Sequence, residues 1–332
     1  MRIHYRKTEQ GIEIVRCYGS DGKIELPGEI SGKAVTRAAA YAFSTGKSRE
    51  EEDVLVYETD EAGIFRRQEQ LLAGERVESV NFPDSMQMIG RYLFYGCRNL
   101  RELSFSDSLS DIGSGAFTGC RSLATLNVRL LNGRRSCVPE ILGDLWQRID
   151  VRFWEERERG YMVQTARLVF PEHYEEAVEN TPARILFTQH HGSGNNYRQC
   201  FYEKEMDYRK YDSLFFTARA QEPPEVLADL VFGRLMYPAG LTGEAQEIYE
   251  AYVREHGAQT AAHLTDTGNM DALREMSRRR LWTDQSLDAA VEYAASKNPG
   301  RRGRGAERRE ILSFLMNEKQ RFFPVRKGKY EL

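Results

Sequence analysis

A step of 23 residues separates matching apolar positions in the sequence, as from Val77 to Leu100 and from Leu100 to Leu123. A fixed period of this size is typical of a solenoid, in which each unit is a short strand followed by a return turn. No single unit can bury its own apolar face, so the sequence predicts that adjacent units stack around one core. The matching sets are Val77, Leu100 and Leu123; Val80, Leu103 and Leu126; Phe82, Phe105 and Val128; Ile89-Gly90 and Ile112-Gly113; Phe94 and Phe117; and Gly96-Cys97 and Gly119-Cys120.

Each residue type within the unit fits a place in such a coil. The alternation Val80-x-Phe82 directs apolar side chains inward, and Pro83 follows the strand, where its missing N–H costs no ladder bond. Gly90 and Gly96 fall where the chain must turn sharply and a Cβ would be unfavourable. The unit is therefore predicted to be one flat coil with a strand on one side.

Stacked coils would place Cys97 and Cys120 one above the other, about 5 Å apart. One interpretation is a disulfide or a metal-binding pair. The favoured interpretation is two small buried thiols, because free cysteine behaves as a small hydrophobe. The chain has 5 cysteines, an odd number scattered along it, and this number does not indicate a disulfide framework.

The string Ile89-Gly90-x-x-x-Phe94-x-Gly96-Cys97-x-x-Leu100 resembles the BspA-like leucine-rich repeat, a bacterial variety. The resemblance covers residues 77–128 and is weaker upstream. It implies a solenoid used for protein binding, and for family members at the cell surface it implies a role in adhesion. A surface adhesin is therefore one functional hypothesis, provided that the chain is exported.

Composition and charge disfavour two classes of protein, those that bind nucleic acid and those that span a membrane. The net charge of −3 over 332 residues disfavours nucleic acid as the partner. No apolar run approaches the ~20 residues that span a bilayer, and the basic start lacks the apolar segment of a signal peptide. We therefore predict a cytoplasmic protein without a membrane segment, and no cofactor is predicted.

The predicted fold class is α+β multidomain, with three parts. Residues 1–128 form a leucine-rich-repeat solenoid, in which residues 1–44 are a capping unit and Ile24-x-Leu26-Pro27 mimics Val80-x-Phe82-Pro83. Residues 45–76 are either a functional insertion or, as we favour, a corrupted repeat with a solvated charged loop and one surviving strand at 54–57.

The other two parts do not show the 23-residue period. Residues 129–220 are predicted to be a small α+β module, and residues 221–332 a helical-hairpin array weakly similar to ankyrin-type or HEAT-type repeats. Helix starts are expected at Pro223-Pro224, Thr242, Asn269 and Thr283. Within the module we expect helices over 139–148, 174–179 and 208–220, strands over 151–154 and 162–170, and a hairpin of 185–187 with 197–201.

The best candidate site is the segment Gln189 to Cys200, which combines paired histidines, a glycine-rich turn, an arginine and a cysteine. If the predicted hairpin forms, a histidine could face the cysteine as in a nucleophile pair. The segment lacks the lysine of a phosphate-binding loop and the fourth ligand of a zinc site. We favour a structural hairpin, assign no catalytic residue and keep a ligand or partner site as the alternative; its residues would be His190, His191, Asn195, Tyr197, Arg198 and Cys200.

A second candidate is basic. Arg278-Arg279-Arg280 and the stretch from Lys297 to Arg309 are strongly positive, but aromatic residues for base stacking are scarce there. We favour a helix–helix loop over a nucleic-acid site. The leading functional hypothesis is a non-catalytic protein–protein interaction scaffold, and an enzyme or ligand-binding module centred on residues 189–200 is the alternative.

Overall fold

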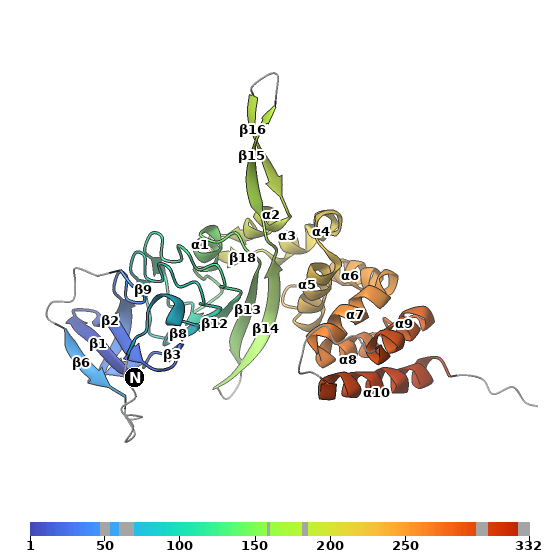
Figure 1. The fold of residues 1–332 in the computed structure, drawn as a ribbon, viewed down its shortest axis with the longest axis horizontal. Coiled ribbons are helices and arrows are strands. Elements are labelled where there is room, and N and C mark those ends of the chain that lie inside the picture. Colours follow the sequence, from blue (N-terminus) through green and yellow to red (C-terminus); the bar gives the residue numbers. More distant parts are fainter. Residues whose placement is uncertain (47–53, 60–69, 158–159, 181–184, 297–304, 325–332) are drawn as a thin grey trace, which may run out of the picture. The chain divides into compact units, whose positions relative to one another are not determined.

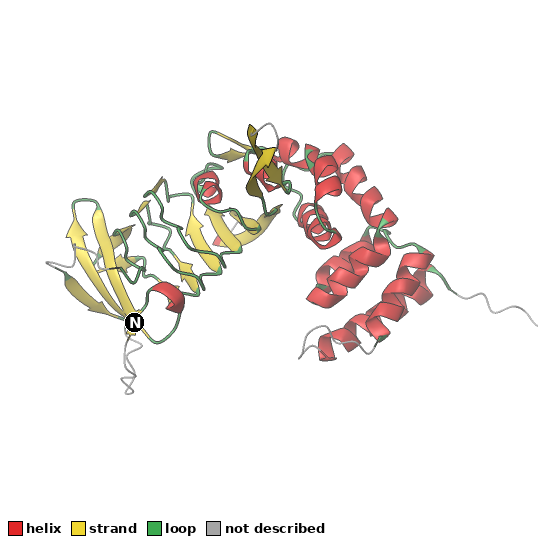
Figure 2. Ribbon diagram, turned by 45° about the horizontal axis from the view of Figure 1, so that its top comes forward, coloured by secondary structure: helices red, strands yellow, loops and turns green. Residues whose placement is uncertain are grey.

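A computed structural model describes the chain except for residues 47–53, 60–69, 158–159, 181–184, 297–304 and 325–332 (Figure 1). The described chain divides into two compact units, Met1–Gln221 and Glu222–Leu332. The first unit holds the repeats and most of the β-structure, and the second is helical (Figure 2). The mixed α+β class predicted from the sequence is confirmed.

The repeats form a six-stranded sheet whose order is β14-β13-β12-β10-β8-β3. Its members from β3 to β13 are parallel, and β14 is antiparallel to β13. Leu103 is aligned with Val80 on one side and with Leu126 on the other, so the 23-residue step is the register of the sheet. The strands are β3 (Lys23–Glu25), β8 (Ser79–Asn81), β10 (Glu102–Ser106), β12 (Thr125–Leu130), β13 (Ile149–Arg157) and β14 (Tyr161–Phe170).

The return side of each coil builds a second wall. There β5 (Lys33–Ala38), β9 (Met88–Ile89) and β11 (Asp111–Ile112) pair in parallel. Successive coils touch at the glycines that follow these strands. A Cβ on Gly90 would lie 2.4 Å from the Ala40 nitrogen, and one on Gly113 would lie 2.2 Å from the Arg91 nitrogen. The prediction that a side chain is unfavourable at Gly90 is therefore confirmed.

Antiparallel strands close the N-terminal end of the solenoid. β1 (Arg2–Thr8) pairs with β2 (Gly11–Gly19), which in turn continues the second wall through β5. β6 (Leu55–Glu58) lies along β1, so a strand is found where one was predicted in the interruption of the period. The charged parts of that interruption, 47–53 and 60–69, lie outside the described residues. The shorter elements are β4 (Glu29–Ile30), β7 (Gln70–Leu71) and a 3₁₀ turn at Gly74–Arg76.

The solenoid core is a stack of equivalent side chains. Ile24 is in register with Val80, as the match of Ile24-x-Leu26 to Val80-x-Phe82 predicts. The Phe94 ring lies 5.4 Å from that of Phe43 and 5.6 Å from that of Phe117, centroid to centroid. All of these side chains are buried.

Cys97 and Cys120 are buried free thiols, so the disulfide interpretation is wrong and the favoured one is confirmed. The Cys97 thiol donates to the Phe43 carbonyl (3.2 Å) and the Cys120 thiol to the Phe94 carbonyl (3.4 Å). Each thiol therefore bonds to the main chain of the preceding coil.

The region after residue 128 partly follows the prediction. The strands expected at 151–154 and 162–170 are present as β13 and β14, and β13 extends the repeat sheet. The helix expected over 139–148 is the shorter α1 (Val138–Gly143). The helix expected over 208–220 is divided at Leu214 into α3 (Tyr208–Ser213) and α4 (Phe215–Gln221). The division of the chain into three parts stays a prediction.

Two expectations in this region are wrong. Residues 174–180 form not a helix but the strand β15 (Tyr174–Asn180), which pairs with β16 (Ile185–His191). The expected hairpin of 185–187 with 197–201 is absent, because β16 has this upstream partner and residues 194–198 form helix α2 (Gly194–Arg198). Cross-strand pairing here overrides the helix propensity of a Glu-rich stretch. The two strands project from the rest of the unit (Figure 1).

The second unit consists of helices, and α5, α6, α8 and α9 begin at the predicted residues. The side chains of Thr242, Asn269 and Thr283 each accept a hydrogen bond from a main-chain N–H in the first turn of the helix that follows. None of the described helices is long and apolar enough to cross a membrane. The helices are α5 (Pro224–Met236), α6 (Gly243–Glu255), α7 (Gly257–Thr267), α8 (Met270–Arg278), α9 (Asp284–Ala295) and α10 (Gly305–Phe322), and the small sheet β17 (Phe201–Tyr202) with β18 (Glu205–Met206) precedes them.

Candidate functional site

The residues of the 189–200 segment belong to different elements. His191 ends β16, where its ring stacks on Tyr174 (centroids 4.4 Å apart) and its Nε2 lies 3.2 Å from a Glu176 carboxylate oxygen. His190 is aligned with Glu175 across the same hairpin, and its side chain lies outside the described residues. The hairpin that would have set a histidine opposite Cys200 does not form.

Two of the candidate residues, Tyr197 and Cys200, pack in the region of α2. Tyr197 is buried against the Tyr211 ring, edge to face, with the ring centroids 4.7 Å apart. The Cys200 thiol is buried and donates weakly to the Asn196 carbonyl (3.7 Å), and burial raises the pKa of this thiol to about 12. Asn195 is half-buried on α2. A thiol held neutral in this way is a poor nucleophile at neutral pH.

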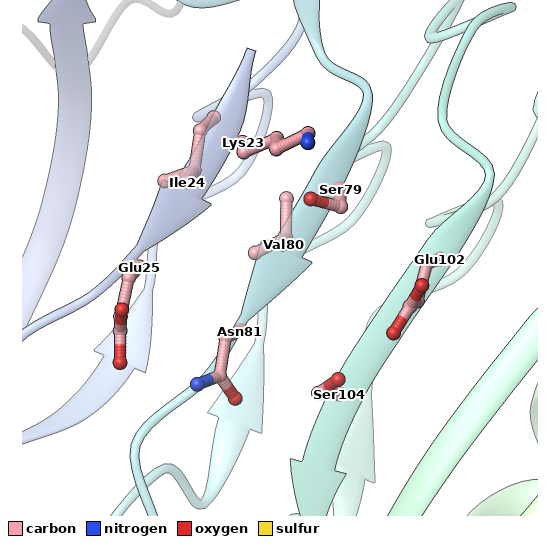
Figure 3. Close-up of a pocket in the computed structure, with 8 residues that line it drawn as sticks. All are labelled: Lys23, Ile24, Glu25, Ser79, Val80, Asn81, Glu102 and Ser104. Atoms are coloured by element: carbon pink, nitrogen blue, oxygen red, sulfur yellow. The ribbon is translucent and has the colours of Figure 1, made fainter. Parts of the chain in front are cut away.

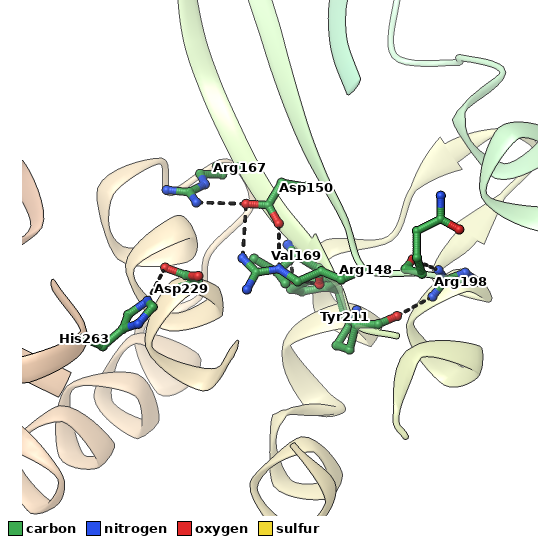
Figure 4. Close-up of polar contacts among 10 residues, drawn as sticks. Arg148, Asp150, Arg167, Val169, Arg198, Tyr211, Asp229 and His263 are labelled. Atoms are coloured by element: carbon green, nitrogen blue, oxygen red, sulfur yellow. Dashed lines mark hydrogen bonds and ion pairs between the residues drawn. The ribbon is translucent and has the colours of Figure 1, made fainter. Parts of the chain in front are cut away.

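The Arg198 side chain links several segments of the main chain through hydrogen bonds. Its guanidinium, which Figure 4 labels, donates to the Pro171 carbonyl (2.6 Å) and the Gln147 carbonyl (2.7 Å). It also donates to the main-chain carbonyls of Leu142, Leu145 and Gly194. Burial lowers the pKa of Arg198 to about 10, so the side chain still carries its charge at neutral pH. Leu142 lies in the last turn of α1, where carbonyl groups lack helical partners and a cation is favourable. The arginine therefore has a structural role.

The second sequence candidate, the basic stretch, is partly described. Arg278 and Arg279 both bind the Glu275 carboxylate, and Arg279 also binds Glu250 (3.0 Å). Arg308 donates to the Ala294 carbonyl (3.0 Å) at the end of α9. These arginines are engaged within the helical unit. Residues 297–304 of the stretch lie outside the described residues.

A more continuous polar surface is the outward side of the six-stranded sheet, which we call the outer sheet face. A shallow groove of about 220 Å³ crosses β3, β8 and β10 there (Figure 3). Strand alternation creates this surface, because Ile24, Val80 and Leu103 point into the core and their neighbours point outward. The face consists of Lys23, Glu25, Ser79, Asn81, Glu102, Ser104, Thr125, Asn127, Asp150, Arg152 and Arg167.

Hydrogen bonds between adjacent coils order this face. Asn127 on β12 donates to a Glu102 carboxylate oxygen (2.6 Å) and to the Ser104 hydroxyl (3.2 Å) on β10. Arg129, two residues further along β12, reaches back to Asp84 (2.6 Å) and to the Asn81 side chain (3.1 Å). A surface whose side chains are already fixed loses less entropy when it binds a partner.

Arginines gather at the β13–β14 end of the face. Asp150 accepts from Arg148 Nε (3.0 Å) and from Arg167 Nη2 (2.9 Å) (Figure 4). Arg152 lies directly across from Arg167 in the antiparallel pair. This group was not predicted from the sequence, although the alternation of Val151, Arg152 and Phe153 indicates that Arg152 points away from the core.

The described residues contain no group of three or more His, Cys, Asp or Glu side chains that could hold a metal ion. Burial raises the pKa values of Cys17, Cys97, Cys137 and Cys200 to about 12. The outer sheet face presents hydrogen-bonding and charged groups.

The repeats match a known family in sequence. A model described as "BspA type Leucine rich repeat region" matches residues 68–132 in 6 copies. The sequence prediction of a bacterial-type leucine-rich repeat is confirmed for this region. A comparison with curated proteins finds no match. The weak similarity of the C-terminal helices to ankyrin-type pairs stays a prediction.

Two solved leucine-rich-repeat structures are similar to parts of the chain. One is a leucine rich cell surface protein from Faecalibacterium prausnitzii A2-165, with 16% identity, a TM-score of 0.26 and coverage of 38% of this chain. The chain spans only 35% of that protein's length. The other is the leucine rich repeat protein of T. pallidum, with 19% identity, a TM-score of 0.21 and coverage of 41% of this chain and 73% of its own.

Proposed function

We propose that the protein is a non-catalytic scaffold that binds another protein on its outer sheet face. The observation that carries the proposal is the row of Asn81, Ser104 and Asn127, equivalent positions on adjacent strands that present polar groups already ordered by hydrogen bonds. The segment that looked most like an active site is used for packing, with its thiol neutral and its arginine bound to carbonyl groups. Both observations favour binding over catalysis.

A pair of matched variants tests this proposal. Ser104→Arg places a long charged side chain in the middle of the face, beside the groove. Thr118→Arg places the same side chain on an exposed turn of the coil, away from the six-stranded sheet. Proteins captured from a lysate of the source organism by photo-crosslinking are identified for both variants and for the wild type.

We expect Ser104→Arg to lose specific partners that Thr118→Arg retains. Capture of the same proteins in the same amounts by all three chains would exclude the outer sheet face as the binding surface. Melting curves of both variants are measured first, so that loss of a partner is not confused with loss of the fold.

The cytoplasmic location is part of the proposal, and the surface location implied by the family resemblance is its alternative. Free cysteines support the cytoplasm, because thiols stay reduced there, whereas exported proteins more often pair them. Protease treatment of intact cells distinguishes the two. A chain that is degraded while a cytoplasmic marker survives would place the protein at the surface.

A further inference from the structure

The β13–β14 end of the outer sheet face carries two arginines in register. Arg152 and Arg167 are directly opposite each other in the antiparallel pair, and their neighbours along the strands, Val151, Phe153 and Leu168, are buried in the core. Side chains directly opposite each other on one face have Cβ atoms about 5 Å apart, and like charges at this separation destabilise the sheet. The arrangement therefore costs the folded protein free energy unless an anion compensates it.

The carboxylate of Asp150, beside this pair, already accepts hydrogen bonds from two arginines. Asp150 binds Arg148 through two hydrogen bonds (3.0 and 3.3 Å) and Arg167 through one (2.9 Å). Arg152 has no hydrogen bond or ion pair with any residue in the described ranges. Arg129 on the neighbouring strand differs, because Asp84, Asn81 and the Phe82 carbonyl occupy its guanidinium. Arg152 is thus a half-buried cation whose charge the neighbouring Asp150 does not neutralise.

We propose that Arg152 and Arg167 form a carboxylate-binding site, which takes a single Asp or Glu side chain of a protein segment lying along the sheet. This inference rests on the proposed scaffold function and names the chemistry of its partner. A planar guanidinium binds a carboxylate through two parallel hydrogen bonds, which fixes orientation as well as charge. Asn127, the residue in register with Arg152 on β12, continues the polar row along which such a segment would extend.

The surrounding charges favour a single carboxylate over a polyanion. Glu25, Glu102 and Asp150 lie on the same face and would repel a chain of phosphates. A nucleic acid needs several cations along its backbone. On this face, in the described part of the chain, the arginine without a protein partner is Arg152. An isolated acidic side chain, flanked by uncharged polar residues that match the Asn and Ser row, fits this pattern.

Calorimetric titration of the full chain with a ten-residue peptide of serine and asparagine that carries one central glutamate tests the site. Arg152→Gln removes the charge at the site, and Arg152→Lys keeps the charge but loses the planar fork. Arg121→Gln is the matched control, because Arg121 is exposed on a turn of the repeats and loses the same charge. We expect Arg152→Gln to weaken binding at least about tenfold and Arg152→Lys to weaken it less, while Arg121→Gln stays within about twofold of the wild type.

Three results would overturn the site. The first is that the wild type does not bind the single-glutamate peptide. The second is that Arg152→Gln and Arg121→Gln weaken its binding equally. The third is that a ten-nucleotide oligothymidylate binds as tightly as the peptide, with the same dependence on Arg152. Removal of the repulsion also predicts that Arg152→Gln melts no lower than the wild type, which separates a binding defect from misfolding. If Ser104→Arg abolishes partner capture while Arg152→Gln leaves binding of the single-glutamate peptide unchanged, the scaffold stands and the carboxylate site fails.

Discussion

Several side chains that looked reactive in the sequence form hydrogen bonds to the main chain. Arg198 donates to five carbonyl oxygens, and the thiols of Cys97 and Cys120 each donate to one. The Gln189–Cys200 segment resembles a catalytic or ligand-binding site because His, Arg and Cys lie close together in its sequence. Residue type alone cannot show whether a guanidinium meets a ligand or a carbonyl, because that depends on segments distant in sequence, such as Gln147 and Pro171.

Arg198→Met should destabilise the first unit by about 3 kcal/mol, because it leaves buried carbonyl oxygens without a donor. Arg198→Lys keeps the charge but reaches fewer of the five acceptors, so we expect an intermediate loss. Urea unfolding of the two variants and the wild type gives the free energies. Equal stability of Arg198→Met and wild type would show that this cluster of hydrogen bonds adds nothing to the fold.

The buried thiols predict a loss of stability in alkali. Burial raises the pKa of Cys97 from 9.0 to about 12, so between these values the native thiol is neutral while the unfolded thiol is ionised. The native state then binds more protons than the unfolded state, and the free energy of unfolding falls as pH rises above about 9. Below pH 9 the thiol is protonated in both states and contributes no pH dependence.

For Cys97 alone this effect amounts to about 1.4 kcal/mol at pH 10. The measurement is the free energy of unfolding in urea at pH 8 and pH 10, for the wild type and for Cys97→Ala. We expect the variant to lose less stability than the wild type between the two values. A variant that loses as much would mean that the thiol titrates alike in both states.

At the scale of the element, the coil was predictable and the hairpin was not. Each coil packs against coils of similar sequence, so equivalent positions lie side by side. The period of 23 residues is therefore enough to predict the register of β8, β10 and β12. The strand β15 has one partner, β16, and its Glu-rich stretch favours a helix when considered alone. Pairing with β16 therefore determines that this stretch is a strand and not a helix. The arginines of the proposed site follow the same logic, since Arg152 meets Arg167 only through the pairing of β13 with β14.

Close stacking of the coils can be tested at a glycine. Gly113→Ala should destabilise the solenoid by about 3 kcal/mol, because the new Cβ would lie 2.2 Å from the Arg91 nitrogen of the preceding coil. Gly28→Ala is the control, since nothing lies within 4 Å of a Cβ at that position. Thermal melting followed by circular dichroism compares the two. Similar melting temperatures for both variants would argue against the close contact between coils.

At the scale of the whole molecule, the two units are each stabilised internally by a different kind of interaction. The first, Met1–Gln221, depends on the register of stacked strands and on a shared aromatic core. The second, Glu222–Leu332, contains an ionic network in which the carboxylate of Glu275 binds Arg278 and Arg279, and Arg279 also binds Glu250 on α6. Burial disfavours the charged carboxylate of Glu275, but hydrogen bonds from the two arginines outweigh it and lower its pKa.

We therefore expect the full chain to unfold in two separable calorimetric transitions, each sensitive to a variant in its own unit. Gly113→Ala should lower the transition of the repeats alone, and Glu275→Gln should lower that of the helices by about 5 °C or more, because Arg279 loses a charged partner. Each variant is the control for the other.

The lowered pKa of Glu275 predicts a pH dependence of the helical transition. Stability that depends on a lowered pKa is present above the pKa of the unfolded state and is lost as the pH falls below that value. Acidification through about pH 4 should thus reduce the difference between Glu275→Gln and the wild type in the helical transition. A single transition that both variants shift equally would show that the solenoid and the helices unfold as one cooperative body.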